Sequence, residues 1–243
     1  MIPLGDRVFG RLDAVRVWKG LADARVNYSA DEVRRPSWNI DTYLTTLPTE
    51  RPGSPEPGGS WEHACRLVRD YQFSPPEIVR ALYDPAAPLL GRDMLLEARF
   101  HGMHFYCGVR VTEVVDETRG NADRVWGWAY ETLQGHLERG KAAYEVVKQQ
   151  DTGQVRFVVS CHSQGAPTLD RITFLGWRLF GRRTQLRFYR RCGERLRDFV
   201  EAALRGEHPA PGPPTGVEHL VCAPSDARTR RLDALAIHRV APG

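Results

Sequence analysis

One short segment of the chain spaces a histidine and a carboxylate for acid–base chemistry. His136 and Glu138 lie two residues apart in YETLQGHLERGKAAYEV (130–146), between Gly135 and Gly140. In an extended chain, side chains at i and i+2 point to the same side, so the carboxylate can orient the imidazole and raise its pKa. This spacing predicts a general base with its orienting group. The alternative is a strand entry shaped by the two glycines, in which backbone or solvent satisfies both polar groups.

A metal site is a second hypothesis for the histidines. It would take His101 and His104 from one strand, His136 and Glu138 from another, and His162 from a third. His101 and His104 are three residues apart, so a regular strand points them to opposite faces. We therefore expect no metal ligands, and the sequence predicts no cofactor.

A serine and two cysteines are weaker candidates. Ser163 follows His162, but adjacent strand residues face opposite ways and no Gly-x-Ser-x-Gly turn surrounds the serine, so we expect it to hydrogen-bond at a strand end. Cys107 and Cys161 fall on apolar strand faces and are expected in the core. The five cysteines occur singly without a Cys-x-x-Cys pair, which is typical of a reducing compartment.

Aromatic side chains recur on one face of a predicted strand, at Trp126, Trp128 and Tyr130. Such a stripe can line a pocket with polar tips or simply fill the core. As ligand-binding residues the pattern predicts Trp128, Tyr130, Thr132, Ser163, Tyr144 and Phe105.

The elements that would position these residues follow from periodicity. Between Met94 and Val159 the apolar period is two, in five segments at hairpin spacing, which predicts an antiparallel sheet. In VRFVVSCHS, alternate side chains should face the core, namely those of Val155, Phe157, Val159 and Cys161. The five segments are MLLEARF, MHFYCGVRVTEVV, RVWGWAYETL, AAYEVVKQQ and QVRFVVSCHS.

Helical periodicity flanks the predicted strands. A helix is expected from the N-cap residue Ser60, and a second short helix in SPPEIVRALYD (74–84), where Ser74 precedes two prolines. After Pro167 a long helix runs to about Leu204, with a kink expected at Gly181. Its predicted apolar stripe contains Ile172, Leu175, Leu179, Leu186, Cys192, Leu196, Phe199, Val200 and Ala203.

These elements predict an α+β fold in which a curved antiparallel sheet grips a long C-terminal helix. Residues 1–59 are expected to form an N-terminal arm and a Pro/Gly-rich linker, and residues 60–206 the helix-grip domain. Residues 207–243 are expected to form a Pro-rich spacer and a tail, whose two short apolar runs dock as strands or stay mobile.

Composition limits the class of protein. The 243 residues are 42% hydrophobic and 26% charged, enough for one core, and no run approaches the roughly 18 apolar residues of a membrane span. The N-terminus lacks an apolar signal core, so we expect a cytoplasmic protein. Residues 178–197 hold eight arginines against Glu194, which fits either the solvated back of a helix or an RNA or anionic partner.

Three stretches of the chain resemble a family known only as a domain of unknown function, DUF1990. They are GSWEHACRLVRDYQFSPPEIVRALYDPAAPLLGRDMLLEARFHGMHF, VWGWAYETLQGHLERGKAAYEV and LGWRLFGRRTQLRFYRR, and the likeness extends from about Asn27 to Val200. The chain departs from the family at Ser163, Gln164 and Gly165, where Ser-Arg is common. The resemblance implies a START-like (SRPBCC) helix-grip fold, which commonly holds hydrophobic molecules under its long helix.

Together these features predict a protein that binds a small hydrophobic or amphipathic molecule between sheet and C-terminal helix. If it is an enzyme, His136 would move protons while Glu138 holds the ring, in a cofactor-free cyclisation, dehydration or hydrolysis. One alternative is a binding or regulatory protein whose arginine-rich helix contacts RNA or another anionic partner. Another is a homodimer in which residues 1–60 and 207–243 wrap a second copy.

Overall fold

The computed structural model describes residues 13–34, 36–100, 103–120, 122–166, 182–207, 219–227 and 237–240. Nine strands form a single sheet in the order β1-β7-β6-β5-β4-β3-β2-β8, and β9 lies parallel to the start of β4. All the other neighbours in the sheet are antiparallel. The strands are β1 (Asn39–Thr46), β2 (Val79–Tyr83), β3 (Asp93–Phe100), β4 (Met103–Thr118), β5 (Asp123–Thr132), β6 (Glu138–Gln149), β7 (Val155–Gly165), β8 (Val221–Ala223) and β9 (Ile237–Val240).

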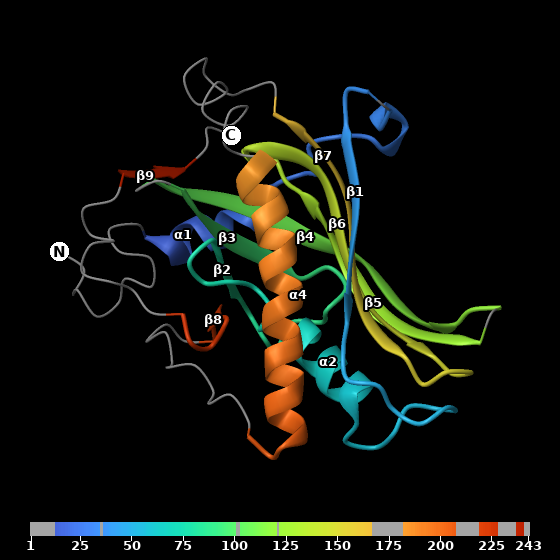
Figure 1. The fold of residues 1–243 in the computed structure, drawn as a ribbon. Helices are drawn as coiled ribbons and strands as arrows, with labels where there is room; N and C mark the ends of the chain where they lie inside the picture. Colours follow the sequence, from blue (N-terminus) through green and yellow to red (C-terminus); the bar gives the residue numbers. More distant parts are fainter. Residues whose placement is uncertain are drawn as a thin grey trace.

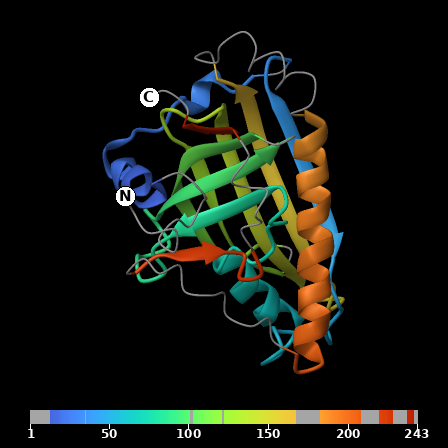
Figure 2. The same cartoon turned by 90° about the vertical axis from the view of Figure 1, so that its left-hand side faces the viewer.

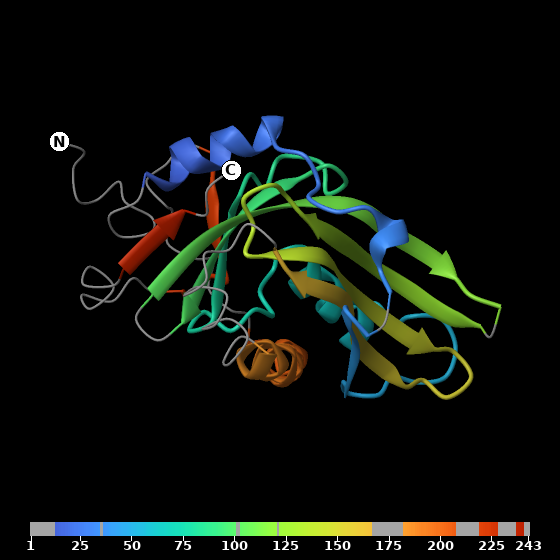
Figure 3. The same cartoon turned by 90° about the horizontal axis from the view of Figure 1, so that it is seen from above.

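The sheet curves around one long helix (Figure 1). Helix α4 (Arg182–Leu204) lies across the concave face, and α2 (Ser60–Arg69) packs beside its C-terminal half (Figure 2). Helix α1 (Ala14–Lys19) lies on the opposite, convex side (Figure 3). Two short 3-10 helices, η2 (Gly20–Asp23) and η3 (Ala30–Glu32), follow α1. This is the predicted helix-grip fold.

The main core lies between the concave face and the two helices. The alternation predicted for β7 is confirmed, because Val155, Phe157, Val159 and Cys161 are all buried toward α4. Helix α4 buries a stripe of seven residues against this face, listed here in order: Phe188, Tyr189, Cys192, Gly193, Leu196, Val200 and Ala203. A smaller apolar cluster lies on the convex side beneath α1.

The five central strands were predicted from the period of two, and the two short strands of the tail agree with its apolar runs. The helix predicted at 74–84 is wrong. Pro75 forms a turn with Ile78 and Val79, and the following residues are strand β2, paired with β3 and β8. Since β2 is buried on both faces, its short apolar run carries no periodicity that distinguishes it from a buried helix.

Two details of the predicted helices also need correction. Leu186 does not belong to the buried stripe of α4, because its side chain is 45% exposed. The N-cap of α2 is Gly59, and Ser60 is the first helical residue. The predicted kink at Gly181 and the predicted stripe before it lie outside the described residues.

The segment expected to be an arm and linker takes part in the sheet. Residues 39–46 form β1, which pairs along its whole length with β7, and this edge position was not predicted. The following Pro/Gly-rich segment is held by Glu50. Its carboxylate accepts backbone N–H groups from Glu56 and Trp61, and the buried Lys148 Nζ donates to it at 2.5 Å. Both side chains of the Lys148–Glu50 pair are at most 2% exposed.

We predict that Glu50→Gln lowers the free energy of unfolding by about 3 kcal/mol, because it leaves the buried Lys148 ammonium without a counter-charge. Urea denaturation would measure the change. The control is Glu56→Gln, which removes an exposed pair with Arg51 and should change stability little. Adding Lys148→Met to Glu50→Gln should recover part of the loss. A single variant as stable as the parent would contradict the assignment of this pair.

Candidate functional site

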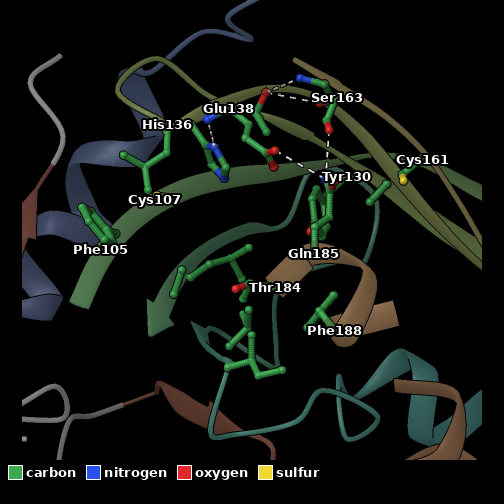
Figure 4. Close-up of a pocket in the computed structure, with 18 of the residues that line it drawn as sticks. Phe105, Cys107, Tyr130, His136, Glu138, Cys161, Ser163, Thr184, Gln185 and Phe188 are labelled. Atoms are coloured by element: carbon green, nitrogen blue, oxygen red, sulfur yellow. Dashed lines mark hydrogen bonds between the residues drawn. The ribbon is translucent and has the colours of Figure 1, made fainter. Parts of the chain in front are cut away.

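A cavity of about 130 Å³, partly open to solvent, lies between the concave face of the sheet and the first turns of α4. Its apolar wall comes from the β2–β4 side of the sheet and from the helix, and includes Leu96, Ala98, Phe105 and Phe188. Its polar end is formed where β5, β6 and β7 meet the N-terminal turns of α4 (Figure 4). The cavity is therefore amphipathic, with its polar groups gathered at one end.

The loop between β5 and β6 places His136 and Glu138 at this polar end. Gly135 adopts φ 80°, and the His136 N–H donates to the Leu133 carbonyl at 3.1 Å, which closes a turn. Gly140 has φ 155°, and a Cβ there would lie 2.0 Å from the His162 carbonyl oxygen of β7. Both glycines are thus required for this strand entry, and His136 and Glu138 nevertheless line the cavity.

The backbone, and not the carboxylate, orients the imidazole. The Glu138 N–H donates to His136 Nδ1 at 2.9 Å. Burial lowers the pKa of His136 to about 4. The expectation that Glu138 raises this pKa is therefore wrong. At neutral pH the imidazole is uncharged, and since Nδ1 is an acceptor the ring proton is on Nε2.

Glu138 is linked to helix α4 through Gln185. The Gln185 Nε2 donates to Ser163 Oγ at 2.9 Å and to Glu138 Oε1 at 3.4 Å. Its Oε1 accepts from Arg182 Nη1 at 2.8 Å, and Arg182 also pairs with Asp41 of β1. The first turn of α4 is thus tied to both the edge strand and the polar end of the cavity.

The charge of Glu138 acts on two nearby phenol groups, those of Tyr130 and Tyr189. Burial raises the pKa of both hydroxyls, and the negative charge of Glu138 raises them further. Tyr130 Oη accepts from Tyr144 Oη at 3.3 Å, and Tyr189 Oη accepts from Cys161 Sγ at 2.9 Å. Both phenols are therefore neutral hydrogen-bonding groups.

The other predicted ligand-binding residues divide into two groups. Phe105, Tyr130, Thr132 and Ser163 line the cavity. Of these, Thr132 has its hydroxyl engaged, since it donates to Asn27 Oδ1 at 2.6 Å and accepts from the Gly140 N–H at 2.9 Å.

Trp128 and Tyr144 are core residues and do not line the cavity. Trp128 is 1% exposed, and its Nε1 donates to the Val68 carbonyl of α2 at 3.1 Å. Tyr144 is fully buried against Phe73 and Phe157. These two aromatic residues therefore fill the core, which was the alternative to lining a pocket.

The metal and nucleophile hypotheses find no support in the described residues. His104 lies 3.0 Å from Glu97, and His162 Nε2 lies 3.0 Å from Tyr28 Oη on the convex side of the sheet, away from Ser163. His101 is outside the described residues. Among the part of the chain that is described, no group of three or more His, Cys, Asp or Glu side chains could hold a metal ion.

Cys107 and Cys161 are buried, as expected, and both also line the cavity. Burial raises the pKa of Cys107 to about 12 and that of Cys161 to about 11. Both are therefore protonated thiols at neutral pH, and all five cysteines of the chain are free.

The arginines of α4 lie largely in ion pairs. Arg190 and Arg191 pair with Glu194, and Arg195 contacts Asp226 and stacks over Phe199. This arrangement fits the solvated back of a helix. No observation on the described residues favours an RNA partner.

Helix α4 contributes site residues that the sequence interpretation missed. Thr184, Gln185, Phe188 and Tyr189 all line the cavity. Their spacing continues the buried stripe by one turn toward the N-terminus, but polar residues and arginines interrupt the apolar pattern there. The signal was the i, i+3, i+4 spacing of Gln185, Phe188 and Tyr189.

Residues 24–195 match the sequence profile of DUF1990, a domain of unknown function, over more than half of the chain. The chain belongs to the DUF1990 family. The matched region of this DUF1990 protein begins before β1 and ends inside α4, so it includes every element that lines the cavity. No curated protein matches the sequence.

Several solved structures align with this chain at low sequence identity. A hypothetical protein from Helicobacter pylori, jhp0584, aligns at 12% identity and TM-score 0.45, over 72% of this chain and 96% of its own. The protein TTHA0849 from Thermus thermophilus aligns at 13% identity and TM-score 0.45, over 68% and 99%. A norcoclaurine synthase point mutant from Thalictrum flavum aligns at 8% identity and TM-score 0.42, over 68% and 94%.

The described part of the chain contains no helix with the length and apolar character needed to cross a bilayer.

We predict that His136 makes stability fall as the pH drops from about 6.5 to about 4. In that range the unfolded chain binds a proton at His136 that the folded protein does not, so the free energy of unfolding rises with pH there and the contribution is lost below it. Urea unfolding at several pH values would show this dependence, and NMR titration would give the pKa directly. His136→Gln should flatten the dependence. A folded-state pKa above 6.5 would contradict the neutral assignment.

Proposed function

We propose that this DUF1990 protein binds a small, mostly apolar molecule in the cavity between the sheet and α4. The observation that carries the proposal is the division of the cavity lining into one apolar wall and one polar end. A cavity of this kind orients a ligand, because the polar group of the ligand is stabilised only where partners exist.

The volume of the cavity indicates the size of the ligand portion that it encloses. An apolar cavity of roughly 150 Å³ in another protein takes up a single benzene ring. With about 130 Å³, this cavity encloses at least one ring, and because it is partly open to solvent it accommodates a compact molecule of one or two fused rings.

The polar end limits the chemistry of the ligand. It offers the neutral donors His136 and Tyr130 and the acceptor Glu138, while Thr132 is engaged within the protein. A ligand with one oxygen or nitrogen function at the edge of a ring satisfies these groups. The negative charge of Glu138 disfavours a ligand carboxylate or phosphate beside it, although Arg99 and Lys141 also line the cavity.

We expect the hydrocarbon indane, one fused ring system of the required size, to stabilise the protein. Ligand at ten times its Kd adds about 1.4 kcal/mol to the free energy of unfolding, which corresponds to a rise in Tm of roughly 3–6 °C. Thermal unfolding with increasing indane would measure the effect.

Two neighbouring alanines of β6 provide a matched test. Ala142 is buried and lines the cavity, whereas Ala143, the next residue, does not line it. Ala142→Leu should abolish the indane shift, and Ala143→Leu should leave it intact. Equal shifts in both variants would place the bound indane elsewhere.

A further inference from the structure

The polar end of the cavity combines one carboxylate with neutral hydrogen-bond donors, and this combination suits a specific reaction class. His136 presents Nε2–H, because Nδ1 is occupied by the Glu138 N–H. The far edge of its ring points into the cavity, and Nε2 has no partner among the described residues (Figure 4). An N–H aimed into a mainly apolar cavity is a donor positioned for a ligand oxygen.

Tyr130 is a second donor of the same kind. Its oxygen already accepts from Tyr144, so its own proton is available to the cavity that it lines. Ser163 Oγ likewise accepts from Gln185 and retains its hydroxyl proton.

Glu138 is placed to accept a proton in the same space. Its side chain points into the cavity beside the His136 ring, and Gln185 fixes the Oε1 atom from the opposite wall (Figure 4). His136 cannot take this role at neutral pH, since Nδ1 faces an N–H group and Nε2 carries the ring proton. Of His136 and Glu138, only Glu138 therefore directs basic atoms at a ligand, and these atoms are its carboxylate oxygens.

We propose that this cavity removes a proton from a carbon atom adjacent to a carbonyl group, with Glu138 as the base and His136 Nε2–H bound to the carbonyl oxygen. This inference rests on the proposed function, since it needs a bound small molecule. It reverses the roles expected from the sequence. The substrate class is a compact, uncharged ketone or related carbonyl compound.

The step balances without a cofactor. A carboxylate oxygen of Glu138 takes the proton, the C–H electron pair forms a carbon–carbon double bond, and the carbonyl π pair moves to the oxygen. The resulting enolate oxygen is held by His136 Nε2–H, with Tyr130 as a second donor. Return of the proton from Glu138 to the same or another carbon regenerates the carbonyl, which gives exchange or isomerisation.

A neutral imidazole is suited to this task. Its N–H is a weaker acid than that of an imidazolium, so it binds the enolate oxygen without transferring its proton to that oxygen first. The lowered pKa of His136 keeps the ring in this form above about pH 4.

The test uses 2-indanone, a ketone matched in shape to indane. The full-length protein in deuterium oxide at neutral pH should accelerate loss of the proton NMR signal of the CH₂ groups beside the carbonyl. Glu138→Gln should slow this exchange by about 100-fold or more, and His136→Phe by a similar factor. His136→Gln keeps an N–H donor and should recover at least about tenfold over His136→Phe.

Indane binding, measured on every variant, separates the two proposals. Indane that binds while 2-indanone shows no accelerated exchange overturns the reaction and leaves the proposed function standing. Exchange that persists in Glu138→Gln but is lost in both His136 variants also overturns the assignment.

Indane that fails to bind the parent protein overturns the proposed function, and the reaction with it. If Glu138→Gln itself loses indane binding, Glu138→Asp replaces it. That variant withdraws the carboxylate by one methylene and should slow exchange at least about tenfold. Unchanged exchange in Glu138→Asp counts against the proposal.

Discussion

The close approach of helix α4 to the edge strand β1 sets the geometry of the whole concave side. At Gly193 the helix lies against Thr45, and a Cβ on the glycine would fall 1.9 Å from Thr45 Oγ1. Any side chain at this position would push the helix away from the strand. A straight helix packed this closely against a curved sheet diverges from it farther along, so space remains away from this contact.

The two sides of this contact are filled differently. Toward the C-terminus, Leu196 and Val200 of α4 are fully buried in the core, and α2 packs against the helix. Toward the N-terminus, Gln185 and Phe188 face the cavity, and Arg182 binds Asp41 of β1. The helix is therefore held at both ends of the open stretch, by packing on one side and by an ion pair on the other, and the cavity persists between them.

Much of this arrangement could be predicted from the sequence, because it depends on local periodicity. Buried and less buried residues alternate along the central strands, as in Val155–Cys161. The family resemblance implied that the sheet curves around the C-terminal helix. Strand β1 was not predictable from its local pattern, since Ile40 and Leu44 of this edge strand are exposed and only its pairing with β7 defines it. The spacing of His136 and Glu138 indicated that both would share one cavity, but not which atoms would face each other.

That last difference decides the chemistry of the site. A buried histidine beside a carboxylate is expected to form a charged pair when the carboxylate faces the imidazole nitrogen. Here the turn after Gly135 puts the Glu138 N–H against Nδ1, so protonation of the ring would set two donors against each other in a buried place. The backbone geometry thus excludes the ion pair and keeps a neutral donor and an anionic acceptor on one wall. Only φ values, side-chain directions and burial together determine this outcome, and none of them is fixed by residue spacing.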